Sequence, residues 1–89
     1  MRKIFPTGVF QRDVKRMVRR KCKTSALYET IELLRLGKDV PLVAKLHKLQ
    51  GEYEGCWECH IEFDWLLIWK YDNNDIILVR TGTHADLFE

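Results

Sequence analysis

The chain has 89 residues, 46% hydrophobic and 31% charged, which predicts one globular domain over residues 1–89 with a single core. No segment approaches the roughly 20 apolar residues of a membrane span, and no apolar run follows the charged amino terminus, so we expect a cytoplasmic protein without membrane contact. The net charge of +2 conceals nine Lys or Arg and one Asp within residues 1–23. Such a block indicates a nucleic-acid partner or, equally on charge alone, a solvated helix face.

The first half of the chain predicts a short apolar start at residues 4–5 and then two amphipathic helices joined by a short turn, as in an antiparallel hairpin. Thr7 can cap the first helix. The second helix begins at Thr24 or Ser25, and Gly37 is its stop signal. The apolar stripes expected to face the core are Phe10, Val14, Met17 and Val18 in the first helix, and Leu27, Ile31 and Leu34 in the second.

From Gly51 onward the hydrophobic pattern changes to period two, which indicates strands. Strands are expected at 56–63, 65–71 and 76–81, followed by a tail at 83–88 that can form one helical turn. The first strand would present Trp57, Cys59, Ile61 and Phe63 on one face, and Glu58, His60 and Glu62 on the other. We therefore predict an α+β fold, in which a two-helix hairpin packs on one face of a small antiparallel sheet of about four strands.

Three histidines and one aspartate are the candidates for chemistry. His60 falls on the polar face of its strand, and Asp64 lies in the turn that follows. His84 and Phe88, four residues apart, would project from one side of the helical turn in the tail. His47 lies in a basic stretch before the first long strand. Because a single histidine is more often a structural or surface residue, the hypothesis rests on the four positions together.

Imidazole groups around one phosphate suit cleavage of RNA by its own 2′-hydroxyl. One group must remove the hydroxyl proton and another must protonate the leaving 5′-oxygen, and an unperturbed imidazole with a pKa of about 6.5 can do either near neutral pH. Asp64 would orient or charge one of the histidines. We favour His84 as the general acid with His60 or His47 as the base, a division that the sequence leaves open.

Three stretches of the second half carry a family resemblance. They are Leu49-Gln50-Gly51, Glu58-Cys59-His60-Ile61-Glu62-Phe63-Asp64-Trp65, and Arg80-Thr81-Gly82-Thr83-His84-Ala85-Asp86-Leu87-Phe88. In this order they resemble the successive signatures of YafQ-type toxins, a branch of the RelE superfamily. The similarity runs from His47 to Phe88, about half of the chain, whereas the first half agrees only in the pattern of its elements, a short strand followed by two helices.

The resemblance implies a RelE-like fold and a ribonuclease that needs no metal or other cofactor, enters the ribosomal A site and cleaves mRNA there. The functional positions of the family fall on His47, His60, Asp64, His84 and Phe88, with Trp65 as a further candidate for RNA contact. The resemblance also implies a cognate antitoxin that holds the toxin inactive, in a complex that often binds its own operator DNA.

Basic side chains are candidates for contact with RNA, because clustered Lys and Arg favour phosphates. They are Arg12, Lys15, Arg16, Arg19 and Arg20 in the first helix, and Lys45, Lys48 and Arg80 in the second half. The chain departs from the family pattern at Trp57, where an arginine often stands, at Leu46, where an acidic residue does, and at Lys48 and Phe63, where proline does. Lys45, Lys48 or Arg80 would have to substitute for the phosphate contact of that arginine. Trp57 itself is expected to pack on the apolar face of its strand.

The cysteines allow other interpretations. Residues 56–60 spell C-x-x-C-H, the signature of c-type haem attachment, but no export signal is present and residues three apart on a strand point to opposite faces. Zinc could be held by Cys22, Cys56 and Cys59, or by the histidines with Asp64, although no second ligand pair at zinc spacing supports it. Cys56 and Cys59 could also be a thioredoxin-like redox pair, but such pairs lie where a strand leads into a helix, and these two lie within a predicted strand. We expect reduced thiols, with Cys59 acting as a small buried hydrophobe.

The main non-enzymatic alternative is a module that uses the basic first helix to bind RNA or DNA without cutting it. Such a module gives no reason for three histidines and an aspartate near strand and tail ends, whereas a nuclease does.

Overall fold

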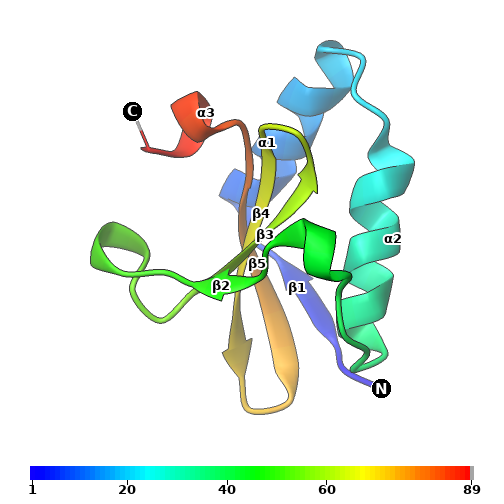
Figure 1. The fold of residues 1–89 in the computed structure, drawn as a ribbon, viewed down its shortest axis with the longest axis vertical. Helices are drawn as coiled ribbons and strands as arrows, with labels where there is room; N and C mark the ends of the chain where they lie inside the picture. The colour runs from blue at the N-terminus through cyan, green and yellow to red at the C-terminus, as the bar shows by residue number, and fades with distance from the viewer. Residues whose placement is uncertain (89) are drawn as a thin grey trace.

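The computed structural model describes residues 1–88, which form one five-stranded sheet with helices on both of its sides (Figure 1). The first half contributes β1 (Ile4–Pro6), α1 (Gly8–Arg19) and α2 (Thr24–Arg35). The second half contributes η1 (Leu42–Ala44), β2 (His47–Lys48), η2 (Gly51–Tyr53), β3 (Trp57–Glu62), β4 (Trp65–Asp72), β5 (Asp75–Gly82) and α3 (His84–Phe88). The predicted α+β class and the helical turn in the tail are confirmed.

The strand order is β1-β5-β4-β3-β2, so the sheet has five strands where about four were expected, and one pairing corrects the prediction that the sheet is antiparallel throughout. Strands β3, β4 and β5 form an antiparallel meander, and the two-residue β2 extends it at one edge. At the other edge β1 pairs in parallel with β5. The sheet is therefore mixed. The short strand expected before the helices is present as β1, but its parallel pairing was not expected. The two residues of β2 are too few to show a period of two, so the sequence pattern does not reveal that strand.

The helices begin and end as their caps predict. Thr7 Oγ1 accepts a hydrogen bond from the Phe10 amide at 3.0 Å, and Gly37 follows α2 with a φ of +71°. The prediction that Val18 faces the core is wrong, since its side chain is 52% exposed, whereas Asp13 is fully buried. A helix turns by about 100° per residue, which places Val18 beyond one edge of the apolar stripe of α1 and Asp13 at its other edge. No helix within residues 1–88 is long and apolar enough to cross a membrane.

Both faces of the sheet are buried. Side chains of α1 and α2 cover one face, where they pack on Cys59, Trp65, Leu67 and Trp69. The other face carries a smaller cluster of Cys56, Leu66, Ile68 and Leu87, the last from α3. Cys56 and Cys59 consequently point to opposite sides, as strand alternation predicts, and Cys59 is the fully buried small hydrophobe expected.

Candidate active site

The tight turn between β3 and β4 meets the first residue of α3. Asp64 occupies the turn with a φ of +52°, and its Oδ1 accepts a hydrogen bond from the His84 amide at 2.9 Å. The same oxygen lies 2.7 Å from His84 Nδ1. The amide, and then the imidazole, lower the pKa of the Asp64 carboxyl. An Nδ1–H that donates to Asp64 leaves Nε2 as the nitrogen available to a substrate.

Two further rings surround His84. The His60 and His84 ring centroids are 5.8 Å apart, and the Phe88 centroid lies 6.2 Å from that of His84. The side chains of His84 and Asp64 are 54% and 46% exposed, so the group is open to a large substrate. The predicted grouping of His60, Asp64, His84 and Phe88 is therefore present in the structure, and His84 and Phe88 share one side of α3 as their spacing predicts.

The third histidine, His47, is held by a buried carboxylate. Its Nε2 lies 3.2 Å from Glu58 Oε1, and its Nδ1 lies 2.8 Å from the Lys45 carbonyl oxygen. His47 pairs directly with Glu58 across β2 and β3, and Glu58 is two residues from His60, so the three side chains share one face. The Glu58 side chain is only 4% exposed, and its Oε2 has no hydrogen-bond partner in the part of the chain that the structure describes. From the sequence, Glu58 is one of several polar residues on its strand, and only its position two residues before His60 indicates that it belongs to the site.

An ion pair fastens α3 to α1. Arg20 donates two hydrogen bonds to Asp86, at 2.6 and 3.0 Å, and Arg16 lies 3.6 Å from the same carboxylate. Asp86 also exchanges hydrogen bonds with Thr83 at 3.0 and 3.1 Å, which caps the short helix. Arg20, followed by the Thr83 contacts, holds the pKa of Asp86 well below its usual range. Two arginines predicted to contact RNA thus also hold the tail that carries His84.

A second set of contacts reaches α3 from the other side. The Tyr53 hydroxyl donates to the Leu87 carbonyl at 3.3 Å, and its ring meets Phe88 edge-on at 5.6 Å. Tyr53 accepts a hydrogen bond from Arg80 at 3.4 Å, while Arg80 makes two shorter bonds to the buried Asp13 at 2.6 and 3.0 Å. Those bonds raise the pKa of the Arg80 guanidinium. Arg80 therefore has a structural role next to the site, because its guanidinium is bonded to Asp13 and Tyr53.

The other predicted RNA contacts divide into exposed and buried groups. Arg12, Lys15, Arg19, Lys45 and Lys48 are exposed, as a phosphate contact requires. Trp65 is only 2% exposed and donates from Nε1 to Thr81 Oγ1 at 2.8 Å, so the prediction that it contacts RNA is wrong. Its position in a continuous apolar strand makes it a core residue. Trp57 packs against the same core, as its strand face predicts.

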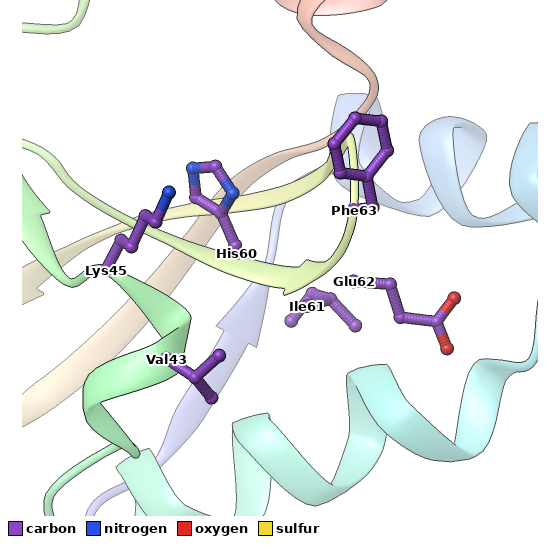
Figure 2. Close-up of a pocket in the computed structure, with 6 residues that line it drawn as sticks. All are labelled: Val43, Lys45, His60, Ile61, Glu62 and Phe63. Carbon is purple, nitrogen blue, oxygen red and sulfur yellow. The ribbon is translucent and has the colours of Figure 1, made fainter.

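A pocket of about 300 Å³ lies next to His60 (Figure 2). It is lined by Val43, Lys45, His60, Ile61, Glu62 and Phe63. The side chains of Lys45 and His60 stand next to each other in this view, and Phe63 projects from the tip of the hairpin. His60 thus belongs both to the pocket and to the histidine group at α3.

The cysteines do not form a ligand set. Burial raises the pKa of the Cys59 thiol to about 12 and also raises the pKa of Cys56. The two side chains pack in different clusters, so they cannot share a metal or a haem without refolding the strand. Among residues 1–88, no three His, Cys, Asp or Glu residues are grouped closely enough to hold a metal ion.

The chain is similar to known proteins over nearly its whole length. The profile of the family described as "Bacterial toxin of type II toxin-antitoxin system, YafQ" matches residues 2–89. The mRNA interferase toxin YafQ of Escherichia coli strain K12 is 38% identical over 84 residues, which cover 92% of this chain and 90% of YafQ. The crystal structure of YafQ from E. coli strain BL21(DE3) superposes with a TM-score of 0.93 at 36% identity, over the full length of both chains. The chain in the E. coli DinJ-YafQ toxin-antitoxin complex gives 0.90 at 37% identity, covering 99% of this chain and 98% of that one. This chain therefore belongs to the YafQ family of bacterial toxins from type II toxin-antitoxin systems.

Proposed function

We propose that this protein, an mRNA interferase toxin by its family, cleaves mRNA in the ribosomal A site by attack of the RNA 2′-hydroxyl on the neighbouring phosphate. The observation that carries the proposal is the His84–Asp64 pair, with the His60 ring 5.8 Å from that of His84 in an open site. Two imidazoles at this spacing can act on opposite ends of one phosphodiester.

The proposed step moves two protons. His60 or His47 takes the proton of the 2′-hydroxyl, and the 2′-oxygen forms a bond to phosphorus as the bond from phosphorus to the 5′-oxygen breaks. His84 gives a proton to that leaving oxygen, so the products are a 2′,3′-cyclic phosphate and a 5′-hydroxyl. No oxidant, metal or other cofactor takes part. Asp64 orients the His84 ring, and Glu58 orients that of His47.

The remaining parts of the proposal concern partners. The exposed basic residues of α1, together with Lys45 and Lys48, would contact phosphates of ribosomal RNA and mRNA. The E. coli relative is known in a complex with the antitoxin DinJ. We extend this to a cognate antitoxin for the present chain, which neutralises it in the cytoplasm and which, as a complex, binds its operator DNA. Clustered positive charge favours an acidic partner segment.

The decisive experiment supplies purified protein to ribosomes that hold a defined mRNA with an empty A site, and maps the new RNA ends. Cleavage should occur in the A-site codon, persist with a chelator selective for transition metals at a Mg²⁺ concentration that keeps the ribosome intact, and leave a 2′,3′-cyclic phosphate or its 3′-phosphate hydrolysis product. An mRNA with 2′-deoxy sugar at the cut nucleotide should resist cleavage completely. Undiminished cleavage of the 2′-deoxy mRNA would reject attack by the 2′-hydroxyl.

A further inference from the structure

Phe63 packs against no other side chain among residues 1–88. It occupies the tip of the β3–β4 hairpin, directly before Asp64, and its side chain is 100% exposed. Across the pocket next to it, Val43 is also 83% exposed. A lone exposed apolar residue needs no explanation, but here an aromatic ring and an aliphatic side chain line one hollow beside a functional group.

The hollow is continuous with the proposed active site. His60 lines the pocket on one side, and on the other its ring meets that of His84. Lys45 adds a positive charge, and its amino group stands on the same side of the hairpin as the His60 ring in Figure 2. Glu62, the acidic residue of the lining, extends away from both toward α2 (Figure 2). A ligand in the pocket therefore meets an aromatic face, a cation and an imidazole.

We propose that this pocket is a subsite for one nucleotide of the substrate RNA, the one that adjoins the scissile phosphate. Its base stacks on Phe63, and a phosphate beside it contacts Lys45. The inference rests on the proposed function, since it takes the cleaved phosphate to lie between His60 and His84. The pocket volume of about 300 Å³ is at the small end of ligand sites, which suits one base.

The chemistry favours RNA over a protein segment as the occupant. Single-stranded RNA exposes unstacked bases, and aromatic side chains bind them through their faces with little dependence on base identity. A lysine next to an aromatic platform matches the alternation of phosphate and base along the strand. The occupant must also leave His60 accessible to a phosphate, which a nucleotide of the cleaved strand does by its own connectivity.

Substitution of Phe63 should separate binding from chemistry. Phe63→Ala should raise the KM for A-site mRNA about 5- to 150-fold, the range of base stacking on aromatic residues, with kcat changed only a few-fold. Phe63→Trp should restore the KM, because it keeps a stacking face. Lys45→Ala should also raise the KM and reduce its salt dependence. Phe5→Ala is the matched control, since Phe5 is half exposed on β1 at the opposite edge of the sheet.

A second measurement observes stacking directly. Ribosomes carry an mRNA with 2-aminopurine next to the cut position and 2′-deoxy sugar at the cut nucleotide, so that binding occurs without cleavage. The wild-type protein and Phe63→Trp should quench the 2-aminopurine fluorescence more than Phe63→Ala does. Equal quenching and equal KM for wild type and Phe63→Ala would overturn the subsite.

The outcomes separate this inference from the proposed function. If the wild-type protein cuts normal mRNA but Phe63→Ala is unaffected, only the subsite fails. If Phe63→Ala cuts normally yet binds the antitoxin more weakly, the pocket is a protein docking surface and the inference is wrong. If the wild-type protein does not cut A-site mRNA at all, the proposed function fails, whatever the fluorescence shows.

Discussion

Arg20 and Asp86 form a two-bond ion pair, at 2.6 and 3.0 Å, between residues 66 positions apart in sequence. The pair joins the end of α1 to α3, and Asp86 is two residues from His84 within that five-residue helix. A helix so short cannot hold its own position, because it forms little more than one turn. The ion pair therefore helps to determine where the His84 imidazole lies relative to Asp64 and His60.

Reversing the charges of this pair should distinguish a positioning role from an RNA contact. Arg20→Asp should reduce the single-turnover rate of mRNA cleavage about 10- to 100-fold at saturating ribosomes, because misplacement of an acid or base by about 1 Å costs that much. Asp86→Arg should be at least as slow, because it also removes the Thr83 contact and places a second guanidinium beside Arg16. The double variant Arg20→Asp/Asp86→Arg should nevertheless be faster than Asp86→Arg alone. If Arg20 acted only by binding RNA, the double variant would be slower than Asp86→Arg.

A matched control for the charge reversal lies on the same helix. Arg19 is exposed and is predicted to contact RNA. Arg19→Asp should weaken ribosome binding in a salt-dependent manner without changing the rate at saturation. Loss of that rate in Arg19→Asp would show that charge on α1, rather than the position of α3, limits cleavage.

Gly82 should tolerate no side chain, because it lies against Asp86. A Cβ at Gly82 would approach Asp86 Oδ2 to 2.9 Å and Asp86 Cβ to 3.0 Å. Gly82→Ala should therefore displace α3 and lower the cleavage rate at saturation at least tenfold while circular dichroism stays near that of the wild type. Gly8→Ala is the control, since a Cβ there would have no neighbour within 4 Å in the described part of the chain. Wild-type cleavage by Gly82→Ala would contradict a fixed position for α3.

The features predicted correctly are those that depend on residues close together in the sequence. Thr7 caps its helix, Asp64 lies in the turn after His60, and the spacing of His84 and Phe88 places both on one side of α3. Contacts between distant residues were missed. Nothing periodic connects Arg20 with Asp86, so both arginines of that contact were assigned to RNA alone.

Burial was the other source of error. Trp65 begins a continuous apolar strand, and such a run does not distinguish an exposed end from a core position. Asp13 was counted only as the one acid in a basic helix. In the fold it accepts hydrogen bonds from Arg80, Arg16 and the Thr81 amide, which is how a fully buried carboxylate is stabilised. Only the assembled structure supplies those partners.

Acid should weaken the fold through its paired aspartates. Arg20 lowers the pKa of Asp86, and the His84 amide lowers that of Asp64. A carboxyl with a depressed folded pKa stabilises the protein above its unfolded pKa of about 4, and this contribution is lost as pH falls through the folded value. In urea titrations Asp86→Asn should be less stable than wild type at pH 7, with the difference shrinking below about pH 4. Asp39→Asn controls for the loss of one surface charge, and a difference that grows in acid would contradict the assignment.

The cysteines should differ in reactivity toward iodoacetamide. The pKa of Cys59 is raised to about 12 by burial and then by Glu58, so its thiolate is scarce at pH 8 and no reagent can reach it. Cys22 is half buried and should be alkylated first, as mass spectrometry of digested protein would detect. In urea all three should react. Rapid alkylation of Cys59 in the folded protein would revive the redox and metal interpretations of the C-x-x-C pair.

The last prediction concerns the proposed acid. His84→Ala should reduce cleavage about a hundred- to ten-thousandfold, because it removes a proton-transfer group. Ribosome binding should change little, because the basic residues that contact RNA are unaltered. Asp64→Asn should cost less, since it weakens the 2.7 Å contact that orients the ring but leaves the imidazole. His60→Ala and His47→Ala should each reduce the same step. Glu58→Gln should act only through His47, so it should add little to His47→Ala.

These losses should not multiply. Groups that act on one transition state are not independent. The variant that lacks both His84 and Asp64 should therefore cleave at about the same rate as His84→Ala. Phe88→Ala should differ in kind, because Phe88 packs on Tyr53 and His84, and its loss lets α3 shift rather than removing a proton carrier. The dependence of the cleavage rate on pH distinguishes the two variants. Phe88→Ala should keep the shape of the wild-type profile at a lower rate. His84→Ala should lose the part of the profile that depends on the protonated acid. A wild-type rate in His84→Ala would reject its role as the acid and, with it, the position assumed for the cleaved phosphate, while the fold would stand.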